Sequence, residues 1–301
     1  MKEEFYKLFN ISEHPLSIAD EQEREEIKNE IYQRLRQSID RQKASKRKLI
    51  SIPLFIRYQA AAVAAGLCIL FIGYSYYSSK RNKIEYITVQ AGKGEVLQIS
   101  LPDHSKVTLN SATMIRYPAR FNGTRDIYLE EGEAYFDVAH DQSKPFIVHS
   151  GVISTKVLGT AFNIKSHKSL PNITVTVSRG RVQVSEQLKT LDILKPDEQL
   201  TFNKKAHKAI TKKVKSVNNI AWTHGDFHLD GVYFNEIMLA IANRFGVKVV
   251  YDPEIFSNCE NSIRFTKKQS LRDVLQVLET IQPMHYTIKK DSVFIKGKPC
   301  N

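Results

Sequence analysis

The sequence predicts a membrane-anchored protein of several domains: a short N-terminal helix, one membrane-spanning helix, an all-β domain and a small α+β domain. Three observations carry this prediction. An uncharged stretch, 58–77, interrupts a chain of ordinary charge, the period of the apolar residues changes from four to two after it, and helical spacing returns near the C-terminus. With 301 residues the chain is also long for one compact core. We therefore place domains at 1–53, 54–79, 84–203 and 222–297, with a basic linker at 204–221.

The N-terminal segment predicts one amphipathic helix between positions 17 and 42. Its apolar side chains recur every four residues and so share one face: Ile27, Ile31, Leu35 and Ile39. An isolated helix has no core on which to bury such a stripe. We expect a partner protein to cover it, with a second copy, a passive spacer, or packing by the nearby Phe5, Tyr6, Leu8 and Phe9 as alternatives.

The stretch YQAAAVAAGLCILFIGYSYY, 58–77, has the length of a membrane span, because 20 helical residues at about 1.5 Å each reach about 30 Å. Tyr58 and Tyr77 stand at its ends, where aromatic side chains favour the membrane interface. A buried soluble helix is one alternative, and a cleaved signal peptide is disfavoured by the long charged leader. Positive charge is greater before the stretch than after it. This predicts a single-pass inner-membrane protein with its N-terminus in the cytoplasm and its C-terminus in the periplasm.

Past residue 84, apolar residues alternate with polar ones, as they do in strands with one buried face. The alternating positions include Leu97, Ile99, Leu101, Val107, Leu109, Ala134, Phe136, Val138, Phe146, Val148, Val175, Val177, Val182 and Val184. Turn residues separate the runs at Pro102-Asp103 and at Arg179-Gly180. Closely spaced strands with little helical pattern predict an all-β domain, either a sandwich or a solenoid-like stack.

The C-terminal segment alternates strands and helices twice, which predicts the small α+β domain over 222–297. We expect its first helix to be capped by Asn235 and to end before Gly246, and its second to be capped by Ser270. The lysine-rich run at 204–215 has neither aromatic residues between the lysines nor a recognition-helix pattern. We therefore interpret it as a solvated linker, with contact to an anionic surface as the alternative, and expect no nucleic-acid binding.

No residue pattern indicates catalysis or a cofactor. The nine histidines are scattered, and no cysteine or carboxylate spacing completes a metal site. There is also no phosphate-binding loop or dinucleotide-binding motif. Cys68 falls in the apolar stretch, so only Cys259 and Cys300 could pair, and their spacing leaves that open. The chain is thus predicted to be no enzyme and to need no cofactor.

Four runs in the β region are similar to the FecR domain in order and spacing over 90–200: LPDHSKVTLNSATMIRYPARF, GEAYFDVAHDQSKPFIVHSG, TKVLGTAFNIKS and VSRGRVQV. His104 stands where that family usually has Gly. Since positive φ is disfavoured for a residue with a Cβ, we expect this turn to change type. The C-terminal segment resembles the small domain shared by secretins and TonB-dependent transporters. Trp222 stands where that domain usually has a tryptophan, and we interpret it as a core residue.

These resemblances imply a transmembrane anti-sigma regulator. The N-terminal segment would bind an extracytoplasmic-function sigma factor, and the C-terminal domain would receive a signal from the N-terminal domain of a TonB-dependent outer-membrane transporter. A periplasmic scaffold without sigma-factor control is the alternative. The FecR resemblance also raises self-cleavage between Gly159 and Thr160, where a hydroxyl directly after Gly could attack the preceding carbonyl in an N-to-O acyl shift. A plain strand turn is the alternative there.

Overall fold

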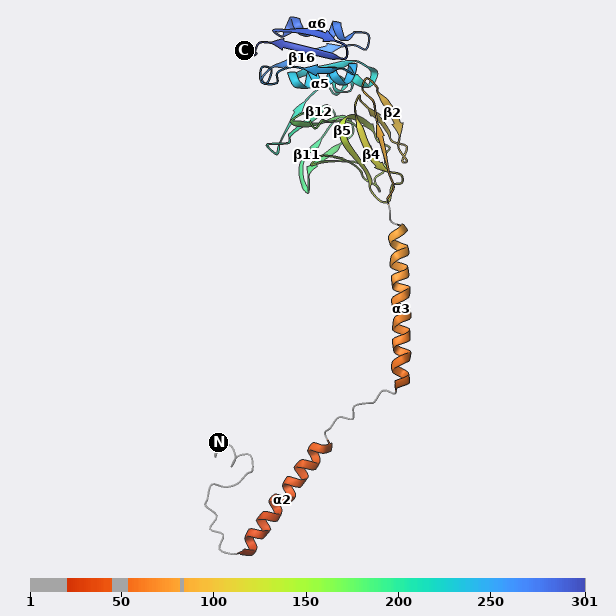
Figure 1. Ribbon diagram of the computed structural model, residues 1–301, viewed down its shortest axis with the longest axis vertical. Coiled ribbons are helices and arrows are strands. Elements are labelled where there is room, and N and C mark those ends of the chain that lie inside the picture. The colour runs from red at the N-terminus through yellow and green to blue at the C-terminus, as the bar shows by residue number, and fades with distance from the viewer. Residues whose placement is uncertain (1–20, 45–53, 82–83, 301) are drawn as a thin grey trace. The chain divides into compact units, whose positions relative to one another are not determined.

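The computed structural model describes residues 21–44, 54–81 and 84–300, and the chain divides into two units, Met1–Arg81 and Asn82–Asn301. The described residues of the first unit form two helices, α2 (Glu21–Ala44) and α3 (Leu54–Arg81) (Figure 1). Helix α2 confirms the helix predicted over 17–42, as far as the described residues reach. The apolar residues at positions 5 to 9 lie outside them, so their predicted packing on the stripe stays a prediction.

Helix α3 carries the uncharged stretch 58–77. Its described side chains, at position 59 and at 63–75, are all exposed. The large apolar ones among them are Val63, Leu67, Ile69, Leu70, Phe71, Ile72 and Tyr74. Judged by length and hydropathy together, none of the helices within the described residues qualifies as a membrane span. The span predicted over 54–79 is therefore not confirmed and stays a prediction.

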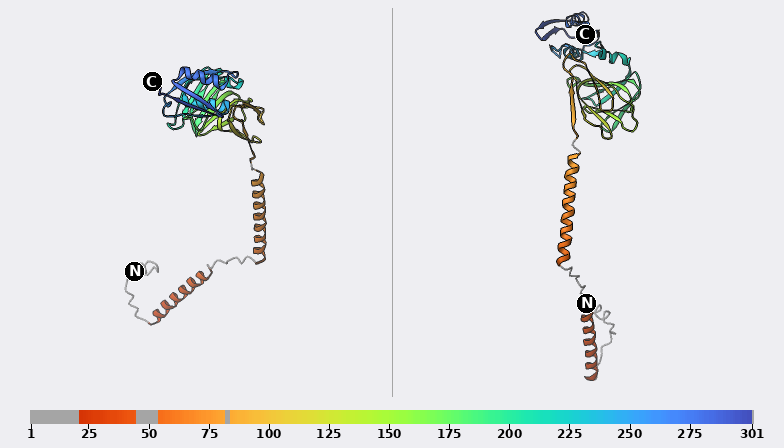
Figure 2. Two further views of the ribbon diagram at one scale, coloured as in Figure 1. Left: turned by 45° about the horizontal axis from the view of Figure 1, so that its top comes forward. Right: turned by 90° about the vertical axis from the view of Figure 1, so that its right-hand side faces the viewer.

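The second unit begins with a β domain of 13 strands around one apolar core (Figure 2). The strands are β1 (Tyr86–Gln90), β2 (Leu97–Ser100), β3 (Lys106–Leu109), β4 (Met114–Pro118), β5 (Arg125–Asp137), β6 (Phe146–Ser150), β7 (Ile153–Val157), β8 (Ala161–Ser166), β9 (Asn172–Arg179), β10 (Val182–Glu186), β11 (Lys189–Leu194), β12 (Glu198–Asn203) and β13 (Lys208–Lys213). One layer runs β1-β4-β5-β6-β7-β10-β11 and the other β2-β3-β5-β8-β9-β12-β13. The all-β prediction is confirmed, and two layers over a common core favour the sandwich alternative.

Strand β5 belongs to both layers, and Gly132 is the point where it passes from one to the other. Its first half pairs with β4 and β6, and its second half pairs with β3 and β8. Gly132 has φ 106°, and a Cβ there would lie 2.6 Å from the Cα of Thr113. Only glycine combines this conformation with so close a backbone approach, so Gly132 fixes where the two layers join.

The lysine-rich run is not the linker that we predicted. Residues 208–213 form the edge strand β13, which pairs along its length with β12. A short helix, α4 (Ser216–Asn219), and a 3₁₀ turn, η1 (Ala221–His224), follow directly. Backbone pairing requires no apolar side chain, and lysines on an edge strand disfavour pairing with a further strand. The run therefore lacks the alternation that reveals the half-buried strands elsewhere.

The turn at 101–105 also differs from expectation. His104 has φ 66°, the left-handed conformation that Gly would favour, so the prediction that this turn changes type is wrong. The amide of Leu101 donates to the carbonyl of Ser105 at 2.9 Å, which closes a short loop with a left-handed residue at its end. Asp103 holds the loop by accepting from the Ser105 hydroxyl at 2.7 Å and from Arg125 at 2.8 Å.

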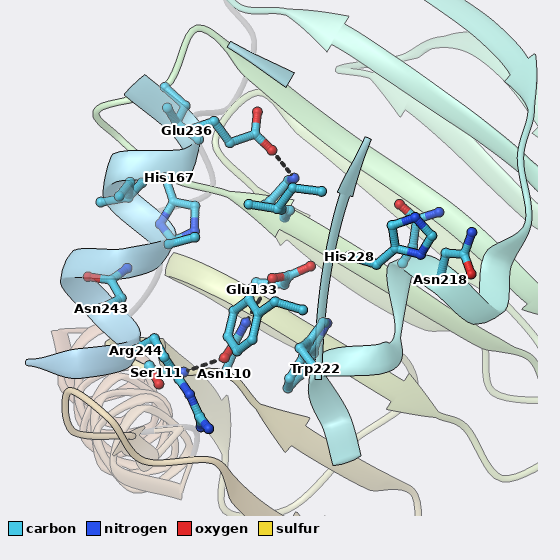
Figure 3. Close-up of a pocket in the computed structure, with 17 residues that line it drawn as sticks. Asn110, Ser111, Glu133, His167, Asn218, Trp222, His228, Glu236, Asn243 and Arg244 are labelled. Atoms are coloured by element: carbon cyan, nitrogen blue, oxygen red, sulfur yellow. Dashed lines mark hydrogen bonds and ion pairs between the residues drawn. The ribbon is translucent and has the colours of Figure 1, made fainter. Parts of the chain in front are cut away.

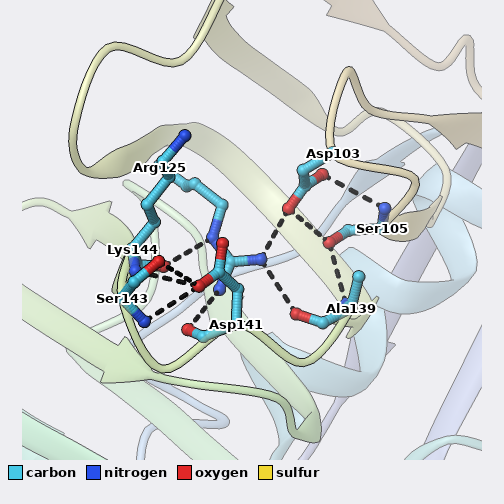
Figure 4. A network of polar contacts seen from close by, with 7 residues as sticks. All are labelled: Asp103, Ser105, Arg125, Ala139, Asp141, Ser143 and Lys144. Atoms are coloured by element: carbon cyan, nitrogen blue, oxygen red, sulfur yellow. Dashed lines mark hydrogen bonds and ion pairs between the residues drawn. The ribbon is translucent and has the colours of Figure 1, made fainter.

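Arg125 is the largest buried charged side chain of the β domain, with 2% of it exposed (Figure 4). Besides Asp103, its guanidinium donates to the backbone carbonyls of Ala139 at 2.9 Å and Lys144 at 2.8 Å. A buried charge is tolerated where it is paired and its remaining donors are satisfied. The side chain thus ties the start of β5 to two loops, and its role is structural.

The second part of the unit is a small α+β domain, as predicted. Its elements are β14 (Phe227–Tyr233), α5 (Phe234–Phe245), β15 (Lys248–Val250), β16 (Glu260–Phe265), α6 (Leu271–Ile281), β17 (Met284–Lys289) and β18 (Ser292–Gly297). Among the strands of the described residues, β14 pairs with β16 alone, and β18 lies between the parallel β15 and the antiparallel β17. A core separate from that of the β domain contains Trp222, which confirms its interpretation as a core residue.

Two of the three predicted helix boundaries are confirmed. Ser270 caps α6 in a capping box with Asp273, and Gly246 ends α5 with φ 68°. The third, Asn235 as a cap, is wrong, because α5 already begins at Phe234. Phe234 is fully buried and stacks on Phe256 at a centroid distance of 4.2 Å. Burying this ring starts the helix before the residue whose side chain could have capped it.

Cys259 and Cys300 form a disulfide, with their Cα atoms 5.4 Å apart. The sequence left this pairing open. The bond ties the end of the chain to the residue before β16 and lies beside the buried Gln282, whose amide contacts both sulfurs. A cross-link over 41 positions restricts the unfolded chain, so we expect it to stabilise the terminal domain.

Candidate functional site

The predicted partner-binding residues lie where the periodicity placed them, on one face of α2. Ile31, Leu35 and Ile39 are about half exposed, at 52%, 51% and 48%, and Ile27 is partly covered. The other faces are charged and carry ion pairs between Glu25 and Lys28 at 2.9 Å and between Glu30 and Arg34 at 2.6 Å. Ion pairs of this kind are stable on a helix surface that faces water. An exposed apolar stripe is not, because its side chains remain in contact with water. The described residues therefore present a narrow apolar surface of about three helical turns.

The predicted cleavage residues, Gly159 and Thr160, lie between β7 and β8. Thr160 is 2% exposed, and its hydroxyl donates to the carbonyl of Arg181 at 3.1 Å. Gly159 is packed so closely against His140 that a Cβ would lie 2.7 Å from its Cα, which gives the glycine a structural role. Self-cleavage stays a prediction. Its test is the mass of the purified second unit, where an intact chain that Thr160→Ala leaves unchanged would exclude it.

The β domain and the terminal domain meet around an ion pair that the sequence did not indicate. Lys165 of β8 pairs with Glu236 of α5, and both side chains are 21% exposed. Burial lowers the pKa of Lys165, but the carboxylates of Glu236 and Glu133 outweigh it and raise the pKa, so the ammonium stays charged. Glu133 is itself held by amide donors from Asn110 at 2.9 Å and Asn163 at 2.8 Å. The junction thus joins the two domains through charge as well as packing.

A pocket at this junction is lined by side chains of both domains, among them Ser111, Glu133, Trp222 and Glu236 (Figure 3). Trp222 is 4% exposed, and neither its ring N–H nor the Ser111 hydroxyl has a hydrogen-bond partner among the residues that the structure describes. Within the described residues, no three metal-ligating side chains gather there or elsewhere.

Sequence reasoning missed the junction for a simple reason. Lys165 and Glu236 lie 71 positions apart, in two domains that the sequence presents separately. Each stands in a pattern that predicts an ordinary solvated charge. Only the docking of α5 against β8 brings them together, and no local signal encodes that docking.

Comparison with known proteins locates two domains of one family. Residues 87–183 match the family described as FecR protein, and residues 226–295 match the family described as FecR, C-terminal. Two crystal structures of a proposed anti-sigma factor from Parabacteroides distasonis ATCC 8503 are similar, both with 26% identity. One covers 71% of this chain and 100% of its own with a TM-score of 0.67, and the other covers 70% and 99% with a TM-score of 0.66. The comparison with curated proteins gives no match.

Proposed function

Because this chain is a FecR-like anti-sigma factor, we propose that α2 binds an extracytoplasmic-function sigma factor in the cytoplasm while the second unit receives a signal in the periplasm. The single observation that carries the first half is the stripe of α2. Ile31, Leu35 and Ile39 recur at helical spacing, yet about half of each side chain is exposed. A partner that covers them gains the free energy of apolar burial, about 1.5 to 3 kcal/mol for each side chain that becomes fully buried.

The stripe has features of a protein-binding helix. An amphipathic helix that docks in a groove uses apolar anchors at spacings of three, four and seven residues, and here the spacing is four throughout. Its charged faces would stay in solvent, where exposed ion pairs contribute little. Binding would therefore depend on the stripe and little on charge.

The test is binding of the cognate sigma factor by residues 1–53 and expression of its target genes in cells. Ile31→Asp with Leu35→Asp places two charges in the contact and should abolish micromolar binding, which needs only about 8 kcal/mol. Glu25→Lys, on a charged face, is the matched control and should change binding little. If the double variant binds and regulates normally, α2 is a spacer and the scaffold alternative gains.

We also propose that α3 anchors the chain in the inner membrane as a single pass. Support comes from its described side chains, which form an exposed apolar surface over 63–75. A helix that is apolar all round is normally covered by protein or by lipid. The disulfide supports the orientation with the second unit outside the cytoplasm, because such bonds persist in oxidising compartments.

Reporter fusions test this topology. A reporter active only in the periplasm should work when fused after Asn301 and fail when fused before Met1. The reverse pattern would place the β domain in the cytoplasm and would remove the transduction mechanism, whatever α2 binds.

For the periplasmic signal we propose the N-terminal domain of a TonB-dependent outer-membrane transporter, bound by the terminal domain. That domain has strands with unpaired edges, such as β14, which pairs only with β16. An extended segment can add to such an edge through its backbone. Capture of the transporter domain should require residues 222–297, tested by comparing the whole second unit with a version that ends after β13. Equal capture by the shortened version would refute the assignment.

A further inference from the structure

A second cavity of the unit, a groove of about 760 Å³, lies between the β domain and the terminal domain. On the β domain it is lined by alternate residues of neighbouring strands: Asn172 and Thr174 of β9, and Gln199 and Thr201 of β12. Side chains of a strand point alternately to opposite faces. The alternation therefore means that one face of the sheet forms the floor of the groove, and this floor is polar.

Strand β14 borders the groove in a different way. Six consecutive residues, 228–233, line it. The face of a regular strand would contribute only every second residue, so the adjacent pairs 228–229 and 232–233 both border the groove because a backbone edge faces it. No residue of β16 lines the groove, and within the described part of the chain β16 is the one strand that pairs with β14. The edge of β14 that faces the groove is thus the unpaired one. It consists of two short regular stretches, 227–229 and 232–233, because a bulge at Asp230 and the left-handed Gly231 interrupts the pairing with β16.

The charge of the groove is positive. Lys212, Lys213 and Lys215 line it where the chain leaves β13, and none of them makes an ion pair or a side-chain hydrogen bond with another of the described residues. A fourth lysine, Lys165, pairs with Glu236, so Asp230 is the one other carboxylate of the lining. Burial and the neighbouring Arg264 lower the pKa of His228, which keeps that side chain neutral at neutral pH.

We propose that this groove binds an extended, acidic segment of a partner protein, which pairs its backbone with β14 and sets its carboxylates against Lys212, Lys213 and Lys215. The unpaired edge supplies backbone donors and acceptors, the hydroxyl and amide floor accepts polar side chains, and the free lysines select negative charge. The inference rests on the proposed function only for the identity of the partner, which would be the transporter domain.

Binding of a segment in the groove would also be coupled to the placement of the two domains. A strand inserted beside β14 would lie between the two domains, next to the Lys165–Glu236 pair that joins them. Its binding would therefore depend on how the two domains are placed, and their placement would in turn depend on binding.

The experiment uses residues 82–301, which form a compact unit. The probe is a fluorescent seven-residue peptide of alternating Glu and Val. Matched probes carry Lys in place of Glu, or Pro in place of every Val, which removes backbone donors. We expect only the first to bind at low salt, and amide resonances of 228–233 to shift on its addition.

Protein variants locate the site. Lys212→Glu with Lys213→Glu should weaken binding by roughly ten-fold or more, and Thr201→Trp, which fills the floor, should do the same without reversing charge. Lys205→Glu with Lys208→Glu is the matched control on the same edge of the sheet, outside the groove, and should change binding less than two-fold. Folding of each variant is checked by its thermal transition.

Several outcomes would overturn the inference: equal binding of the proline peptide, resonance shifts away from β14, or equal losses in the control variant. Dimers of the free unit that Thr201→Trp dissolves would also overturn it, because a second copy would then be the occupant. If the peptide binds as expected but the transporter domain does not, the groove stands and only its proposed partner is wrong. Sigma-factor binding by residues 1–53 is unaffected in every case.

Discussion

Helices α2 and α6 both place apolar residues at helical spacing, sparsely in α2 and densely in α6, but only the apolar face of α6 is buried. In α6, Val274, Leu275 and Leu278 are fully buried against the strands of the terminal domain. In α2, Leu35 and its neighbours on the stripe stay about half exposed. An apolar face on a short helix must be covered by something, and α6 finds its cover within the chain. This contrast supports the proposal that a partner covers α2, and on that proposal the stripe should tolerate substitution in isolation.

The largest expected effect comes from placing the same charge in both helices. Leu278→Asp would bury an unpaired carboxylate and remove core packing, so we expect the terminal domain to unfold, a loss of several kcal/mol. Leu35→Asp should leave the thermal transition of the full chain unchanged, within about 0.5 kcal/mol. Calorimetry on both variants checks this, with the outward-facing Val277→Asp as a control on α6. A marked loss from Leu35→Asp would mean that α2 already packs within the chain.

Removal of the disulfide should have the next largest effect on stability, and this effect should be confined to the second unit. Replacing Cys259 and Cys300 by Ser should cost about 2 to 4 kcal/mol of the terminal domain's free energy of unfolding, since the cross-link closes a loop of some forty residues. Urea denaturation with and without reductant measures it. Reductant should destabilise the native unit by a similar amount and leave the double variant unaffected. Equal stability of all samples would show that the bond contributes nothing.

The ion pair at the junction should make a smaller contribution to the free energy of unfolding. It stabilises the contact between the two domains and not the core of either one. Lys165→Met leaves Glu236 partly buried without its partner, and we expect a loss of about 1 to 2 kcal/mol, less than for a fully buried pair because both groups keep some solvent contact. A double-mutant cycle with Glu236→Gln isolates the pair, and Lys156→Met, on an exposed position of β7, is the control. Additive effects would show that the two side chains are not coupled.

Acid should have the smallest effect, again confined to the second unit. Burial raises the pKa of Glu131, but hydrogen bonds from His167 and from the amide of Lys168 outweigh it and hold the pKa below the usual 4.5. Because the folded-state pKa is the lower one, the stabilisation is complete above pH 4.5 and is lost as the pH falls through the folded value. Denaturation curves from pH 6 to pH 3 should fall less steeply for Glu131→Gln. Parallel curves would contradict this role.

Local patterns were enough for most of the fold. Alternation located strands such as 97–100 and 146–150, and the capping residues Ser270 and Gly246 located two helix ends. These succeeded because side-chain period and backbone caps act within a few residues. Strand β13 was missed because an edge strand needs no apolar face, and the start of α5 was missed because the burial of Phe234 decided it.

The sequence by itself determined the class of each domain, the family resemblance and the stripe of α2, because each depends only on residue type and spacing within one stretch of chain. Only the tertiary structure decided that Cys259 and Cys300 pair, that β5 joins both layers, and that β14 presents an unpaired edge over a polar sheet face beside four lysines. Those features arise where segments tens of residues apart pack together. Their free energy depends on burial, on the docking of distant segments and on shape, and the local spacing of residues along the chain does not predict it.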